Sequence, residues 1–166
     1  MSVTGWRTNL AWAQFRMLPT PPPGETEDAQ TEASIEPPAQ VSVQQDGSQL
    51  KLAGFDVRVR LVSSGTWLVR GRATPSLLSH EQGHWDIAGL TAHEYHRALA
   101  DLRAADQASL SQQAAEALQR IQTKVDALQE KYDSETDHSR NAAQQARWQG
   151  AISMAIGNNY AALPDP

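Results

Sequence analysis

Two histidines stand four residues apart in the stretch LLSHEQGHWDIAGL, residues 77–90, and a glutamate directly follows the first of them. On a helix, His80 and His84 share one face with Cβ atoms about 5–6 Å apart, so both rings can present a nitrogen to one metal ion. Glu81 points about 100° away from His80, beside the open side of that ion. Its carboxylate is therefore placed to act as a general base that deprotonates water for attack on a carbonyl.

The pattern His-Glu-x-x-His is typical of zinc hydrolases when it opens a helix directly after a strand region. Gly83, inside the motif, costs about 1 kcal/mol of helix propensity relative to alanine, which indicates a local packing demand. The alternative is a solvent-facing helical turn that carries two titrating histidines. A catalytic zinc site normally has three protein ligands and one open position, so a third ligand must come from elsewhere in the chain.

The two nearest further histidines do not supply this ligand. His93 lies 13 residues after His80, about 20 Å along a continuous helix, so neither His93 nor His96 reaches the same ion. We expect both on a solvated helix flank. The metzincin pattern requires glycine at position 87 and histidine at position 90, where this chain has Ile87 and Leu90, so that class is excluded.

The remaining candidate ligands lie together in KYDSETDHSRN, residues 131–141, which we expect to form a polar break between two helices. His138 is the last histidine of the chain. Three carboxylates flank it: Asp133, Glu135 and Asp137. Carboxylates are also common zinc ligands, so each stays an alternative to His138. Tyr132 is a candidate hydrogen-bond donor to the oxyanion that forms when water attacks, although it also continues the apolar stripe of the preceding helix.

Three helices are predicted to carry these residues. Between Ser79 and Pro164 the chain contains no proline and is rich in Ala, Leu, Gln, Glu and Arg. Ser79 is suited to cap a helix from His80 to about Asp101. A second helix is predicted from a capping box formed by Ser109 and Gln112. Its apolar stripe, which faces a core or a partner, is Leu110, Ala114, Ala117, Ile121, Val125 and Leu128. A third helix is expected over residues 141–156.

Strands are predicted before the helices. From Val41 to Arg72 the hydrophobic period becomes two, with a turn signal at Asp46-Gly47 and strict alternation in FDVRVRLV. We expect three or four antiparallel strands here, including TWLVRG, with NLAWAQF as a possible extra strand. Residues 19–40 carry prolines at both ends and one large aliphatic side chain, Ile35, so we expect a mobile loop.

Length and composition narrow the possibilities further. A chain of 166 residues with 40% hydrophobic residues is long enough for one domain, residues 1–166. The net charge of −5 gives no basic face for nucleic acid. There is no cysteine, so any metal would be held by His, Asp or Glu. We recognise neither a signal peptide at the start nor a window long and apolar enough to span a bilayer.

The combination of HEQGHWDI with YDSETDH about fifty residues later, and then Gln145 and Trp148, resembles a bacterial family of predicted secreted zinc-dependent proteases, long described as a domain of unknown function. The second family motif, Tyr-Asp-x-x-Thr-x-His-Gly, matches Tyr132, Asp133, Thr136 and His138. The chain departs from this motif at Ser139, where the family has glycine. The resemblance implies a histidine ligand at His138 and a secreted or periplasmic location.

Together with the order of strands and then helices, the resemblance implies an α+β, zincin-like fold. A small N-terminal antiparallel sheet would precede a helical part that carries the metal helix. In such a fold, TWLVRG would be an edge strand along which an extended peptide substrate adds.

These observations predict a zinc-dependent peptidase in which His80, His84 and His138 bind Zn²⁺ and Glu81 is the general base. Two alternatives stay open. One is a zinc-dependent amidase or hydrolase that acts on a non-protein substrate such as a cell-wall component. The other is a non-catalytic module whose helical stripe pairs with a partner helix. The sequence leaves the oligomeric state open.

Overall fold

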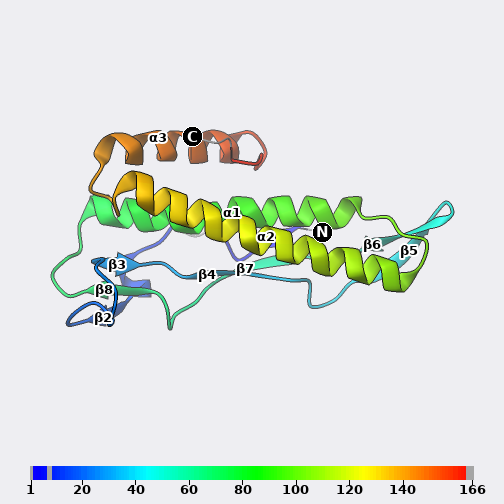
Figure 1. The fold of residues 1–166 in the computed structure, drawn as a ribbon, viewed down its shortest axis with the longest axis horizontal. Coiled ribbons are helices and arrows are strands. Elements are labelled where there is room, and N and C mark those ends of the chain that lie inside the picture. The colour runs from blue at the N-terminus through cyan, green and yellow to red at the C-terminus, as the bar shows by residue number, and fades with distance from the viewer. Residues whose placement is uncertain (1, 7–8, 164–166) are drawn as a thin grey trace.

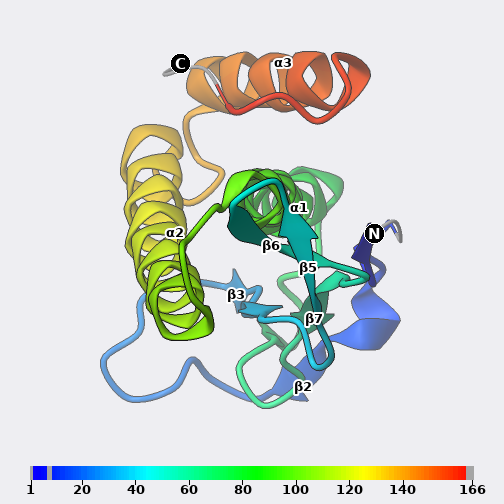
Figure 2. The ribbon, with the colours of Figure 1, turned by 90° about the vertical axis from the view of Figure 1, so that its right-hand side faces the viewer.

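The computed structural model describes residues 2–6 and 9–163. Helix α1 (Pro75–Asp101) lies at the centre, and helices α2 (Gln107–Thr136) and α3 (Ala142–Gly157) cover two of its sides, while the strands lie against another (Figures 1 and 2). Within the described residues, no helix is long and apolar enough to cross a membrane.

Helices α1 and α2 begin a few residues earlier than their sequence signals indicate. Thr74 caps α1 by accepting a hydrogen bond from the Leu77 backbone N–H at 3.1 Å, and Pro75 occupies the first turn, where it is favoured. Asp106 caps α2 and accepts from the Ser109 backbone N–H at 2.9 Å. The predicted caps Ser79 and Ser109 are therefore wrong, because a stronger cap stands a few residues upstream. The end of α1 and the third helix are confirmed.

In the part of the chain that the structure describes, eight short strands form three small sheets. Their bounds are β1 (Val3–Thr4), β2 (Arg16–Leu18), β3 (Ala29–Gln30), β4 (Ala33–Glu36), β5 (Ser42–Asp46), β6 (Gln49–Ala53), β7 (Val57–Leu61) and β8 (Trp67–Val69). The sheet orders are β1-β7-β4, β2-β8-β3 and β5-β6. The predicted all-antiparallel sheet is wrong, because β1 pairs with β7 and β2 pairs with β8 in parallel. The β5-β6 hairpin confirms the predicted turn after Asp46.

Two segments differ from prediction in the N-terminal half. The possible strand over residues 9–15 contains instead a single 3-10 turn, Trp12–Gln14. The loop predicted over residues 19–40 is wrong for residues 29–36, which form β3 and β4. Side chains at alternate positions face inward there, since Ala29, Thr31 and Ile35 are buried. This segment therefore packs against α1 despite the polar composition around it.

The core between the helices and the sheets follows the predicted alternation of β7. Val57 and Val59 are buried, and Arg58 between them is exposed. The fold is α+β, with small sheets and three helices. β8 lies between β2 and β3, so the prediction that TWLVRG is an edge strand is wrong. Because β8 already pairs on both sides, it has no free edge for another chain.

Two histidines of α1 pack on aromatic rings away from the motif. His93 stacks on Tyr160 with ring centroids 4.0 Å apart, and His96 lies on Phe55 at 5.0 Å. Both side chains are partly buried, so the solvated flank expected for them is wrong. Their role in the fold is packing.

Candidate metal centre

The motif residues lie buried at the centre of the molecule, in the first half of α1. Exposed fractions are 2% for His80, 1% for Glu81 and 8% for His84. The two histidines share one helix face, as their spacing predicts, and their Nε2 atoms lie 3.1 Å apart. A solvent-facing turn, the alternative considered for this motif, is therefore wrong.

Helix α2 brings a carboxylate to both rings. Asp133 Oδ1 lies 3.1 Å from His80 Nε2 and 2.9 Å from His84 Nε2. The polar break expected over residues 131–141 begins later than predicted, because α2 continues to Thr136. Asp133 thus stands on a regular helix, and its direction is fixed by the packing of α2 on α1.

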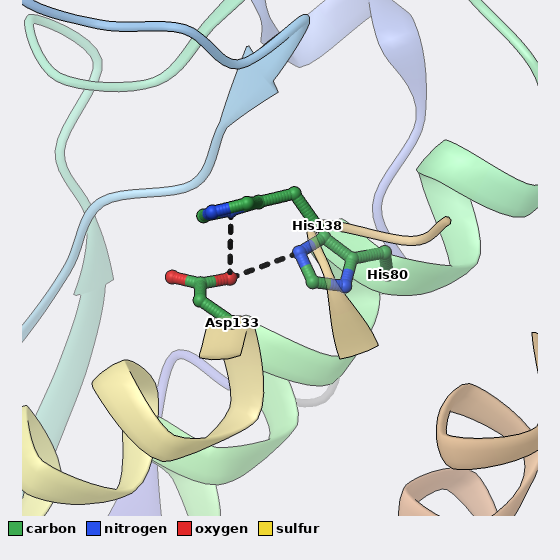
Figure 3. Close-up of side chains that lie close together, drawn as sticks. All are labelled: His80, Asp133 and His138. Carbon is green, nitrogen blue, oxygen red and sulfur yellow. Dashed lines mark hydrogen bonds and ion pairs between the residues drawn. The ribbon is translucent and has the colours of Figure 1, made fainter. Parts of the chain in front are cut away.

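His138 reaches the same place from the turn between α2 and α3. Its Nδ1 lies 3.5 Å from Asp133 Oδ1, and the ligand atoms of His80, Asp133 and His138 all lie within 4.8 Å of one another (Figure 3). The turn that aims His138 has three successive left-handed residues, with φ of 47° at Asp137, 49° at His138 and 75° at Ser139. Glycine adopts this conformation without strain, which explains why the resembling family has glycine at the position of Ser139.

The other two flanking carboxylates point elsewhere. Glu135 accepts a hydrogen bond from Trp148 Nε1 at 2.8 Å. The Asp137 side chain is 65% exposed and lies 3.5 Å from Arg140. Of the three acids left open by the sequence, only Asp133 lies among the histidines.

Two glutamine amides hold the outer ring nitrogens. Gln129 Oε1 lies 2.6 Å from His84 Nδ1, and Gln145 Oε1 lies 3.1 Å from His80 Nδ1. Gln129 comes from α2, one turn before Asp133, and Gln145 comes from α3. A single sequence gives no local signal for such contacts, and only the resemblance drew attention to Gln145.

Tyr132 is fully buried beneath the motif. Its hydroxyl donates to the His80 carbonyl oxygen at 3.2 Å and accepts from Gln145 Nε2 at 2.6 Å. Burial, the largest effect, raises the pKa of this phenol. In this geometry the Tyr132 hydroxyl positions His80. Donation from Tyr132 to an oxyanion stays a prediction, and it requires the hydroxyl to break its hydrogen bond to the His80 carbonyl oxygen.

The Glu81 carboxylate has the character expected of a general base. Its Oε2 has no hydrogen-bond partner among the described residues. Burial raises the pKa of this carboxyl, against a smaller lowering by the charge of His84, the hydroxyl of Thr31 and the charge of His80. Glu81 lines a cavity of about 90 Å³ together with His80 and His138. Glu81 is thus a residue of the cavity wall, and its Oε2 is a buried oxygen.

Glu27 belongs to the site although the sequence placed it in a loop. Its Oε1 lies 3.0 Å from His138 Nδ1. It borders both the cavity beside Glu81 and a second cavity of about 270 Å³ that is lined by His84, Asp133 and residues 30–33. Burial raises the pKa of the Glu27 carboxyl. The available sequence signal that this segment packs inward was the alternation of Ala29, Thr31, Ala33 and Ile35 with polar residues.

His84 and Asp133 influence each other's ionisation, because their side chains lie 2.9 Å apart. Burial alone would lower the pKa of His84, but the hydrogen bond and charge of Asp133 outweigh it and raise that pKa to about 9. Burial likewise raises the pKa of the Asp133 carboxyl, and the two histidines reverse this and hold it well below its usual range. The pair is therefore an ion pair at neutral pH.

The donor atoms of His80, His84 and Asp133 are spaced as a zinc ion requires, and His138 has a comparable spacing from Asp133. Ligand atoms about 2.0–2.1 Å from a tetrahedral zinc lie about 3.3 Å from one another. The separations here are 3.1 Å between the two Nε2 atoms, 2.9 and 3.1 Å from these to Asp133 Oδ1, and 3.5 Å from that oxygen to His138 Nδ1. Imidazole and carboxylate are both zinc ligands.

Residues 15–139 match the model of a family described as "Bacterial protein of unknown function (DUF922)". The chain belongs to this family. The matched region contains every site residue described above except Gln145, and the family description names no activity. Comparison with curated proteins and comparison with solved structures each found no match. The match supports the part of the resemblance that places the chain in a bacterial family of unknown function. Zinc binding and proteolytic activity are not part of the family description.

Proposed function

We propose that this protein is a zinc-dependent hydrolase that cleaves peptide bonds. The observation that carries this proposal is the convergence of His80 Nε2, His84 Nε2 and Asp133 Oδ1 to within 3.1 Å of one another, with His138 beside them. Next to this cluster stands a buried carboxylate with an unpaired oxygen, Glu81 Oε2, on the wall of a cavity. Ligands around a general base at an open space are the parts that metal-assisted hydrolysis requires.

In this proposal His80, His84 and His138 hold the zinc ion. A zinc ion held there would make a bound water more acidic and polarise the carbonyl of a substrate. Glu81 Oε2 accepts the proton of the attacking water and then donates it to the leaving amine. The raised pKa of Glu81 suits the first step, because a carboxylate with a higher pKa is a stronger base and takes the proton of water more readily. The protonated carboxyl then donates this proton to the leaving amine in the second step.

Asp133 is the competing third ligand. Its oxygen lies nearer the two motif histidines than His138 does, and it stands on a rigid helix. We retain His138 because the resembling family has a histidine there and because the strained turn aims its ring at the cluster. Asp133 would then balance the charge of the site from beside the ion.

An extended peptide has one free strand edge available near the cluster. β3 is an edge strand of its sheet, and residues 30–33 line the cavity of about 270 Å³ together with His84 and Asp133. A peptide that paired with this edge would place a carbonyl over the histidines, with main-chain hydrogen bonds supplying affinity. This arrangement replaces the expected pairing with β8.

The sequence left two alternative functions open, a hydrolase of a non-protein substrate and a non-catalytic helical module. A non-protein substrate would use the same water-activating residues, and no contact in the structure favours it. A module that offers its helical stripe to a partner is disfavoured, because Leu110 and Ile121 on that stripe are buried within the chain's own fold. Secretion or a periplasmic location remains part of the proposal, since it rests on the resemblance.

Metal content and hydrolysis test this function together. The parent protein should bind about one zinc and cleave a mixed library of internally quenched peptides. His84→Ala should lose the metal, whereas Glu81→Gln should keep it and lose about 10²–10⁴-fold in cleavage rate, because only the general base is removed. A parent that bound no zinc, or a Glu81→Gln variant as active as the parent, would overturn the proposal.

A further inference from the structure

A glutamine side chain is linked to each motif histidine at two points. One link is to the ring of the histidine, and the other is to its backbone carbonyl oxygen. Gln129 contacts His84 Nδ1 with its oxygen and donates its Nε2–H to the His84 carbonyl oxygen at 3.0 Å. Gln145 contacts His80 Nδ1 with its oxygen and donates its Nε2–H to Tyr132, whose hydroxyl donates to the His80 carbonyl oxygen. The two glutamines thus make the same pair of contacts, except that the Tyr132 hydroxyl stands between Gln145 and the His80 carbonyl oxygen.

The backbone contacts fix which way each amide points. A carbonyl oxygen only accepts hydrogen bonds, so the Gln129 atom beside the His84 carbonyl must be the NH₂ group. The single proton of the Tyr132 hydroxyl is used on the His80 carbonyl, so the Gln145 atom beside that hydroxyl must also be the NH₂ group. In both cases the amide oxygen is left facing the ring nitrogen.

The amide oxygens in turn fix the tautomer of each histidine. Because an amide oxygen only accepts, His80 and His84 must both carry a proton on Nδ1. Thr136 Oγ1, 3.4 Å from His80 Nδ1, donates its own proton to the Tyr132 carbonyl oxygen and so leaves that nitrogen to donate. In the neutral rings, both Nε2 lone pairs then point into the cluster.

We propose that Gln129 and Gln145 are positioning residues of the metal centre, which hold His84 and His80 as Nδ1–H tautomers so that both Nε2 atoms bind one ion. This inference rests on the proposed metal site and goes beyond it. Outer contacts of this kind are commonly made by carboxylates, which raise the basicity of the ligand. A neutral amide makes the histidine a weaker electron donor to zinc than a carboxylate does. A zinc ion bound there would keep more of its positive charge and would make a bound water more acidic.

The test combines zinc affinity with a direct readout of the tautomer. Zinc affinity is measured by chelator competition, and ring protonation is read from long-range ¹H–¹⁵N correlations of the zinc-loaded protein. Gln129→Leu removes the acceptor, Gln129→Glu keeps it, and Gln122→Leu is the matched control on an exposed position of the same helix. We expect Nδ1–H on both rings of the parent, about 10–100-fold weaker zinc binding in Gln129→Leu, and little loss in Gln129→Glu or Gln122→Leu.

The outcomes separate this inference from the proposed function. A parent that bound no zinc would overturn both. A parent that bound zinc with Nε2–H on either ring, or a Gln129→Leu variant that bound zinc as tightly as the parent, would overturn only the positioning role. If Gln129→Leu did not fold, the tautomers of the parent and the affinity of Gln129→Glu would still decide the matter.

Discussion

The ring of Tyr132 packs directly on Gly83, in the middle of the turn that carries His80 and His84. A Cβ atom at position 83 would collide with the hydroxyl and the ring carbons of Tyr132. Gly83 lowers the helix propensity of α1, and this loss is offset because the missing side chain lets α2 approach α1 closely. The predicted packing demand at Gly83 is confirmed.

Gly83→Ala should destabilise the protein by about 1–3 kcal/mol, because the two helices must separate to admit a methyl group. The measurement is the free energy of unfolding in urea. Gly150→Ala is the control, since no atom lies within 4 Å of a Cβ there and helix propensity favours alanine by about 1 kcal/mol. Equal effects at the two positions would contradict the packing argument.

The third ligand can be identified by paired substitutions in the α2–α3 region. His138→Ala should weaken zinc binding more than Asp133→Asn, and Asp137→Asn should have no effect because that side chain is exposed. Zinc affinity by chelator competition is the measurement. The reverse order of the first two variants would make Asp133 the third ligand.

Zinc binding should release about one proton at pH 7.5. His84 has its pKa raised to about 9 in the metal-free protein, so below that pH the incoming ion must displace a proton. The apparent zinc affinity should rise about tenfold per pH unit from pH 7 to 9 and level off above. Calorimetry in two buffers of different ionisation heat counts the protons. Identical heats would show that none is released.

Ser139→Gly should stabilise the protein by about 0.5–1 kcal/mol, because position 139 has a φ of 75°, where a side chain is strained. The thermal unfolding midpoint should rise by a few degrees. Ser134→Gly, at an exposed position within α2, should instead lower stability by about 0.5 kcal/mol. A loss of stability in Ser139→Gly would show that the turn is held by contacts of the serine side chain.

Local patterns predicted the parts of the site that lie close together in sequence. The spacing of His80 and His84 determined that their nitrogens would meet, since a helix fixes that geometry whatever surrounds it. Residue chemistry alone left His138 and three carboxylates as candidate ligands, and the resemblance of YDSETDH to the family motif favoured His138. Asp133 stayed one of three equal acids, because a helix break was expected over residues 131–141, where α2 in fact continues to Thr136.

Contacts that depend on tertiary packing escaped prediction. Gln129 reaches a histidine 45 residues away, and nothing in its neighbours marks it. Glu27 was hidden by the proline-rich composition around it. The parallel pairing of β1 with β7 joins Val3 to Val57, and parallel pairs carry no turn signal that a sequence could show.

The partners of His80 lie far along the chain, Asp133 by 53 residues and Gln145 by 65. During translation at about 5–20 residues per second, α1 therefore leaves the ribosome about 3 to 13 s before its last partner has been synthesised. In that interval its buried histidines and Glu81 have none of the contacts that satisfy them. The complete cluster can consequently form only after α3 has been synthesised, and a nascent chain that stalls before Gln145 holds His80 without the contact to its Nδ1 atom.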